Sequence, residues 1–141
     1  MNKIIHIILI SIISLTVISC AKKSDSSSTT SSGLFVAVGY SGTLLTSSDG
    51  TSWTSRTSGS SENLWNSYYG NSTFVTVGAS GTILTSSDGT TWTSRTSGTS
   101  ENLYGITYGN STFVVVCDND SGSVGTILTS SDGITWVSRT S

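Results

Sequence analysis

Three aspartates occupy the same place in a recurring segment and are the first candidates for acid–base chemistry. Asp49, Asp88 and Asp132 each follow two serines and precede a glycine. Hydrolysis of a glycosidic bond needs two carboxyl groups roughly 5 to 10 Å apart. Equivalent residues of successive repeats diverge from one another, and an Asp-Gly pair is a strong hairpin signal. We therefore expect these aspartates to shape turns.

Three arginines recur in the same way, each within the pattern Trp-x-Ser-Arg-Thr. Arg56, Arg95 and Arg139 would bind a single carboxylate only if their side chains converged on it. Because repeat-equivalent side chains diverge, we expect them to face solvent or to donate hydrogen bonds between neighbouring repeats.

Four aromatic residues are the best candidates for ligand contact. Strand alternation would place Trp65 and Tyr69 on one face, and Tyr104 and Tyr108 on the matching face of the next repeat. Rows of such rings can stack on sugars, and they can equally fill the core between repeats. The sequence leaves both roles open.

Histidine chemistry and metal binding have little support. The single histidine, His6, lies in the expected leader, so a mature chain would lack His-activated nucleophiles and His-containing zinc sites. Cys117 stands where other repeats have glycine, and we expect a buried thiol. The segment 118–122 resembles the start of a calcium loop but lacks the later carboxylate. We predict no metal and no cofactor.

The candidate residues belong to a unit that occurs three times. The segment Gly42–Trp53 recurs as Gly81–Trp92 and as Gly125–Trp136, with spacings of 39 and 44 residues. The preceding Phe-Val-x-Val segments keep a spacing of 39, which places a five-residue insertion after Val116 in the third unit. A period near 40 without helical patterning is typical of stacked β units.

Each unit is predicted to form four short strands. In the second unit they are residues 63–69, 73–77, 82–86 and 91–96, separated by Gly, Asn, Ser and Asp turns. The Phe-Val-x-Val strand is apolar at consecutive positions, so neighbouring sheets should cover both of its faces. The fold class is therefore all-β.

The Ser-Ser-Asp-Gly-x-x-Trp segments resemble the Asp-box (BNR) repeats of sialidases and the related blades of photosystem II assembly factors. The resemblance covers residues 33–141 and implies a β-propeller blade whose Ser, Asp, Gly and Trp build a hairpin. The chain departs from the common form by lacking one residue between Asp and Gly. The residues with this implied structural role are Ser47, Asp49, Gly50, Trp53, Ser86, Asp88, Gly89, Trp92, Ser130, Asp132, Gly133 and Trp136.

The repeats predict an incomplete propeller-like array of about 2.8 units of four antiparallel strands, with a three-repeat β-trefoil-like fold as the alternative. The first unit lacks a leading strand in its expected place, because residues 31–33 are Ser-Ser-Gly there. Open sheet edges favour pairing with another chain. We expect self-association that completes the propeller.

The N-terminus is predicted to be a lipoprotein signal. Lys3 and the apolar run that follows form a secretory leader over residues 1–19, too short to span a membrane as a helix. Its end, Val17-Ile18-Ser19-Cys20, resembles the bacterial lipobox, which implies lipidation of Cys20. Residues 20–32 read as a Ser/Thr-rich flexible tether before the repeats. The protein would be exported and anchored at the inner or outer membrane or the cell surface.

The net negative charge of the chain argues against nucleic acid as a partner. The chain has 6 Lys and Arg against 8 Asp and Glu, so it lacks the basic surface that nucleic-acid binding needs. We predict a non-catalytic binding or scaffolding module with a glycan or protein ligand. The alternatives are a sialidase-like glycan-processing enzyme and a truncated piece of a longer repeat protein without separate function.

Overall fold

The protein folds into three four-stranded antiparallel sheets. A computed structural model describes residues 17–23, 33–118 and 125–139. Two 3-10 turns, η1 (Tyr40–Gly42) and η2 (Ala79–Gly81), are the only helical segments within these ranges. The strands are β1 (Val17–Lys23), β2 (Leu34–Gly39), β3 (Leu44–Ser47), β4 (Thr54–Ser55), β5 (Leu64–Gly70), β6 (Thr73–Gly78), β7 (Ile83–Ser86), β8 (Thr93–Arg95), β9 (Asn102–Gly109), β10 (Thr112–Asp118), β11 (Ile127–Ser130) and β12 (Val137–Arg139).

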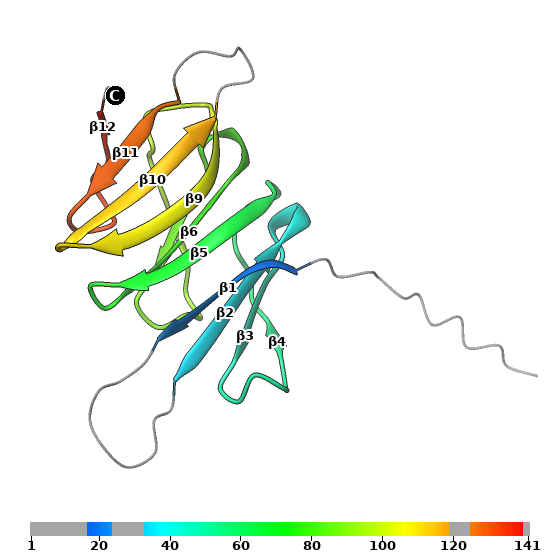
Figure 1. Cartoon of the computed structure of the whole chain (residues 1–141). Helices are drawn as coiled ribbons and strands as arrows, with labels where there is room; N and C mark the ends of the chain where they lie inside the picture. Colours follow the sequence, from blue (N-terminus) through cyan, green and yellow to red (C-terminus); the bar gives the residue numbers. More distant parts are fainter. Residues whose placement is uncertain (1–16, 24–32, 119–124, 140–141) are drawn as a thin grey trace, which may run out of the picture.

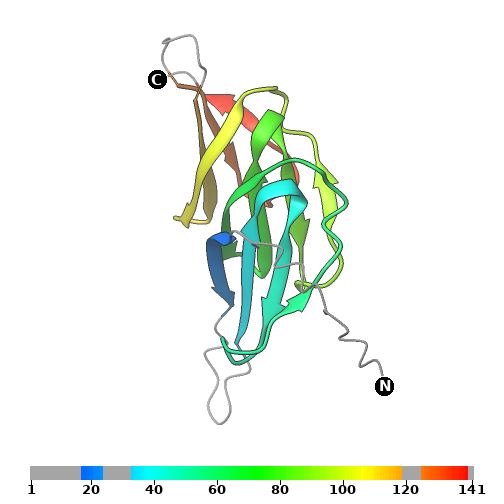
Figure 2. The ribbon, with the colours of Figure 1, turned by 90° about the vertical axis from the view of Figure 1, so that its right-hand side faces the viewer.

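Each sheet is a simple meander of consecutive strands. Sheet 1 contains β1 to β4, sheet 2 contains β5 to β8, and sheet 3 contains β9 to β12. The first strands β1, β5 and β9 lie side by side along one edge of the array (Figure 1). Figure 2 shows sheets 1 and 3 at opposite ends with sheet 2 between them. This is an incomplete propeller-like array of three separate sheets and not a β-trefoil.

The predicted strands of the second repeat are confirmed to within about two residues. Phe74, Val75, Thr76 and Val77 of β6 are all fully buried. Alternate residues of a strand point to opposite faces, so a neighbouring sheet must cover each face of β6. Sheet 2 is therefore the buried centre of the array.

Two apolar clusters fill the spaces between sheets. The first lies between sheets 1 and 2 and includes Val36 and Val38 from β2 against Phe74 from β6. The second lies between sheets 2 and 3 and includes Val75 from β6 against Phe113 from β10. The two clusters use equivalent positions of the repeat, so one packing rule builds both interfaces.

Two glycines with positive φ angles bind the linkers that connect successive sheets. Gly42 and Gly81 have φ angles of +68° and +70°, and their N–H groups donate to the carbonyls of Glu62 and Glu101 at 2.8 and 2.7 Å. A Cβ on Gly42 would overlap the carbonyl of Ser60. Only glycine fits this turn and lets the linker pass so close.

The prediction that the first unit lacks its leading strand is wrong. Strand β1 pairs antiparallel with β2, with Cys20 opposite Ala37 and Lys23 opposite Leu34. The segment comes from the predicted lipobox and the start of the predicted tether, so residues 20–23 are not tether in this structure. An open edge of β2 would leave N–H and C=O groups unpaired, and β1 satisfies them. Residues 1–16 and 24–32 of the predicted leader and tether lie outside the described residues.

Candidate functional site

The three Asp-Gly loops, residues 47–53, 86–92 and 130–136, share one hydrogen-bond pattern. In the second loop the Ser86 hydroxyl donates to Asp88 Oδ1 at 2.9 Å and accepts from the Gly89 N–H at 2.8 Å. The N–H groups of Thr90 and Thr91 both donate to the same Asp88 oxygen at 2.8 Å. The first and third loops repeat these bonds within 0.1 Å. The carboxylate thus replaces a backbone acceptor and closes the turn.

These bonds also determine the charge of the loop aspartates. Backbone hydrogen bonds from Thr135 and Ile134 are the main cause that lowers the pKa of Asp132 to about 2. The pKa values of Asp49 and Asp88 are lowered further by equivalent bonds. Donors that stabilise the charged form keep a carboxylate ionised at neutral pH. A group held in this state is suited to maintaining a turn and poorly suited to donating a proton.

Two of the loop tryptophans pack onto the neighbouring core. Trp92 lies against Phe74 with ring centroids 6.4 Å apart, and Trp136 lies against Phe113 at the same distance. Each indole N–H donates at 3.1 Å to the carbonyl of its own loop glycine. Trp53 is 39% exposed, whereas the other two are half-buried. The tryptophan of sheet 1 therefore lies on a face that no other described sheet covers.

The arginines bond within their own sheets, which corrects one of the two expectations, that of bonds between repeats. As for the other, Arg139 is exposed to solvent, and Arg56 and Arg95 are half-buried. Nε of Arg95 donates to Thr85 Oγ1 at 2.8 Å, across the β7–β8 pair. Arg56 bonds to Thr46 and Arg139 to Thr129 in the same way, each at 2.9 Å. These threonines recur with the same spacings as the arginines, and this shared spacing is the signal in the sequence from which the pairs could have been predicted.

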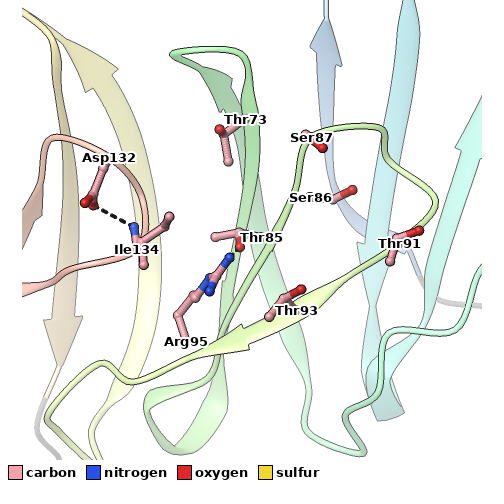
Figure 3. Close-up of a pocket in the computed structure, with 9 residues that line it drawn as sticks. All are labelled: Thr73, Thr85, Ser86, Ser87, Thr91, Thr93, Arg95, Asp132 and Ile134. Atoms are coloured by element: carbon pink, nitrogen blue, oxygen red, sulfur yellow. Dashed lines mark hydrogen bonds between the residues drawn. The ribbon is translucent and has the colours of Figure 1, made fainter.

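A cavity of about 280 Å³ lies between sheets 2 and 3 beside Arg95. Figure 3 shows Arg95 next to Thr85, with Asp132 and Ile134 of the third Asp-Gly loop across the cavity. Asp132 Oδ1 accepts a hydrogen bond from the N–H of Ile134 at 2.8 Å. The arrangement is a half-open crevice between the two sheets, and the loop of the following sheet forms its far side.

Two of the four aromatic candidates come together. Trp65 and Tyr104 stack with ring centroids 4.3 Å apart and planes 6° from parallel. Each lies where the pairing register of its strand shifts, between Leu64 and Asn66 in β5 and beside Leu103 in β9. A β-bulge interrupts strand alternation. Consequently Trp65 is not on the core face with Tyr69, as simple alternation predicted, and the same holds for Tyr104 and Tyr108.

The other two candidates are packing residues in this structure. Tyr69 tilts against Phe74, and Tyr108 against Phe113, each with ring centroids 4.6 Å apart. Both rings pack against the apolar clusters between sheets. A Cβ on Gly70 would collide with the ring of Tyr108, so this glycine makes room for the ring. Tyr104, at 44% exposure, is the most accessible of the four.

The two cysteines lie in different environments. Cys20 on β1 is exposed, and Cys117 on β10 is only 6% exposed. Burial, followed by the charge of Glu101, raises the pKa of the Cys117 thiol to about 11. The Cys117 thiol is therefore protonated and unreactive at neutral pH.

Within residues 17–23, 33–118 and 125–139, no three His, Cys, Asp or Glu side chains are grouped as metal ligands. The calcium-like segment 118–122 lies outside this range apart from the backbone of Asp118. In the same described part of the chain, no helix is long and apolar enough to cross a membrane. Comparisons with protein-family models, curated proteins and solved structures found no match.

Proposed function

We propose that this protein is a non-catalytic binding or scaffolding module, held at a bacterial membrane through a lipid on Cys20. The repeated chemical groups support this proposal, because each of them already serves the fold. The loop aspartates accept hydrogen bonds from their own turns, and the arginines donate to threonines of their own sheets. Both kinds of side chain are committed to structure in all three repeats.

The observation that carries the binding role is the stack of Trp65 and Tyr104. One face of the Tyr104 ring contacts Trp65, and the residue remains 44% exposed. A paired, immobile aromatic ring loses little conformational entropy when it binds, and its free face can stack on a sugar ring or an aromatic side chain. We therefore assign the ligand platform to Tyr104, with Trp65 as its support.

The anchoring role rests on the residues 17–20 and the polar tract behind them. The exposed position of Cys20 on β1 is compatible with attachment of a lipid. The hydrogen bonds among Ser, Asp and Gly, which recur in all three loops, support membership of the Asp-box family. The loop tryptophan joins this set in sheets 2 and 3, where its indole N–H donates to the loop glycine.

Binding can be tested with an array of immobilised oligosaccharides. We expect the full chain in mild detergent to bind some of them, and Tyr104→Ala to reduce that binding at least about tenfold. Tyr68→Ala is the matched control, because Tyr68 is a similarly exposed tyrosine at 37% and lies outside the stack. Equal loss in both variants, or binding that Tyr104→Ala leaves intact, would contradict the assignment.

A further inference from the structure

The outer face of sheet 3 is largely apolar, and no other sheet in the described part of the chain covers it. We use this name for the side of sheet 3 that points away from sheet 2. It is formed by Val114, Val116, Ile127 and Val137 together with Thr129 and Arg139. Val116 is 49% exposed, whereas Val38 and Val77 at the equivalent positions of sheets 1 and 2 are fully buried. Val137 is 45% exposed on the same face. The third repeat thus carries the residues of an interface that is filled twice elsewhere in the array.

The equivalent faces of sheets 1 and 2 are each covered by the sheet that follows. Val36, Val38 and Leu44 of sheet 1 pack against Leu64, Phe74 and Leu84 of sheet 2. Val75, Val77 and Ile83 of sheet 2 pack in the same way against sheet 3. The covering surface is therefore the opposite face of a following repeat, centred on its Phe-Val-x-Val phenylalanine.

Sheet 1 presents that covering surface to no other described sheet. The outer face of sheet 1 carries Phe35, Ala37, Leu45 and Trp53 at the positions that sheet 2 uses to cover sheet 1. Trp53 is 39% exposed and Phe35 is half-buried, whereas Ala37 and Leu45 are already buried at 2% and 9% exposure, so Trp53 and Phe35 are the residues of this face that a partner can reach. Lys22 lies over the Phe35 ring, with Nζ 5.2 Å from the centroid, where Tyr69 covers Phe74 in sheet 2. The apolar stem of a lysine can pack in place of a tyrosine ring while its amine reaches solvent.

The Asp-Gly loops also show that no described sheet precedes sheet 1. A Cβ on Gly89 would meet Leu34 of sheet 1, and one on Gly133 would meet Thr73 and Val75 of sheet 2. Gly50, in the first loop, faces only Phe35 of its own sheet and is exposed, although Gly89 and Gly133 are buried. The first loop lacks the preceding sheet against which the other two pack.

A hydrogen bond links sheets 2 and 3, and the residues equivalent to its donor and acceptor lie at the two outer faces of the array. The Asn71 amide of sheet 2 donates to the Ser131 carbonyl of the third loop at 3.2 Å. The same positions of the repeat are Asn110 in sheet 3 and Ser48 in the first loop, and both residues are exposed. A donor thus lies beside the outer face of sheet 3, and its acceptor lies beside the outer face of sheet 1.

A second crevice, of about 230 Å³, lies on sheet 3 at the position equivalent to the crevice beside Arg95, and no loop of a following sheet bounds its opposite side in the described part of the chain. It is lined by Thr129, Val137 and Arg139, the equivalents of Thr85, Thr93 and Arg95. In the first crevice, Asp132 and Ile134 of the next loop supply the opposite side. Their equivalents in the loop of sheet 1 are Asp49 and Thr51.

We propose that the outer face of sheet 3 binds the outer face of sheet 1 of a second copy of this chain. The contact repeats the packing between sheets 1 and 2, with Val116 buried near Phe35 and Asn110 donating to Ser48. It is a head-to-tail contact, so it builds a ring where the rotation closes and a filament where it does not. The proposal is independent of the ligand assigned to Tyr104, and it concerns the chain without a lipid on Cys20.

Docking also has a consequence for Cys20. Its register equivalents Ser67 and Ile106 are 3% and 8% exposed, because the preceding sheet covers them. A docked copy would bury Cys20 in the same way. A lipid on Cys20 and a docked copy therefore compete for one face of sheet 1.

The test uses the full chain made by cell-free synthesis without membranes, so that Cys20 keeps a free thiol. Sedimentation in density-matched detergent is expected to show dimers or larger species. Val116→Glu should weaken association at least about a hundredfold, because it buries an unpaired carboxylate at the contact. Val137→Glu should act in the same direction. Tyr40→Glu is the control, since Tyr40 is 50% exposed and lies in η1, outside both faces.

Mixing separates head-to-tail contact from other modes. Trp53→Glu damages the opposite face, so each variant alone should be monomeric, while an equal mixture with Val116→Glu should form heterodimers through the intact pair of faces. Association through two sheet 3 faces would survive Trp53→Glu, and association through the apolar leader would survive both substitutions. Either result, or a folded wild-type chain that stays monomeric, would overturn the proposal. Thermal unfolding of each variant confirms that it is folded.

Discussion

Trp65 and Tyr104 stack within 4.3 Å of each other because a β-bulge sits at the same position of two successive repeats. The bulge removes each ring from the regular alternation of its strand. Without the bulge, strand alternation would place both rings on the core faces of their strands, where Tyr69 and Tyr108 lie. A local irregularity of the backbone thus creates the most exposed aromatic surface of the first strands.

Trp92→Ala should destabilise the protein much more than Trp53→Ala. Trp92 packs against Phe74 and bonds to Gly89, so its loss should lower the free energy of unfolding by about 3 kcal/mol. Trp53 is 39% exposed, and its truncation should cost about 1 kcal/mol or less in the monomer. Urea unfolding of both variants in the Val116→Glu background measures the difference. Equal effects would show that the loop tryptophans do not differ in packing.

Arg95→Ala should have a small effect. Its bond to Thr85 lies at the rim of a crevice, so we expect a change within about 1 kcal/mol in the free energy of unfolding. Thr85→Val removes the same hydrogen bond from the other partner and serves as the matched control. A double variant with additive losses would contradict a direct interaction between the two side chains.

The loop aspartates should make stability depend on pH in the acid range. The folded-state pKa of Asp132 is lowered to about 2, below the ordinary value of an aspartate, so its stabilisation is complete above that ordinary value. Stability should be lost as the pH falls from about 4 towards 2. Melting temperatures of Asp132→Asn should vary less over this range than those of the wild type. Ser131→Ala, which leaves the carboxylate in place, should keep the wild-type dependence.

The two thiols should react at very different rates. In the unlipidated Val116→Glu chain, the exposed Cys20 should react with a maleimide in the folded state, although partial burial raises the pKa of its thiol, whereas Cys117 should react only after unfolding. Burial and a pKa of about 11 both suppress the Cys117 thiolate. Mass spectrometry of peptides after brief labelling assigns the sites. In wild-type chains that have associated, each Cys20 covered by a docked copy should be protected as well, so a closed ring protects all of them and an open assembly leaves one reactive.

Lipid attachment should change the first strand. Cleavage before Cys20 would remove Ser19, whose hydroxyl donates to Asn66 at 3.0 Å and accepts from the Ser67 N–H at 3.3 Å. Ser19→Ala should therefore cost about 1 kcal/mol in the unprocessed chain and nothing in the processed one. Mass spectrometry of protein from bacterial membranes should show an acylated N-terminal Cys20, and none in Cys20→Ser. An unmodified chain would refute the anchor.

The sequence by itself determined the parts of this protein that depend on nearby residues. The spacing of the repeats, the strands of the second unit and the role of Asp49, Asp88 and Asp132 in turns follow from alternation and from bonds that span two or three residues. Such features are encoded where they occur. They repeat because the same short segments repeat.

Tertiary structure decided what depends on residues far apart. Strand β1 has no sequence likeness to β5 or β9, and it joins sheet 1 because the edge of β2 needs a partner. The bulges at Trp65 and Tyr104 appear only in the pairing register. Val77 and Val116 occupy the same place in the repeat, yet one is fully buried and the other 49% exposed. Burial depends on whether another sheet is packed against a residue, and the local sequence does not contain that information.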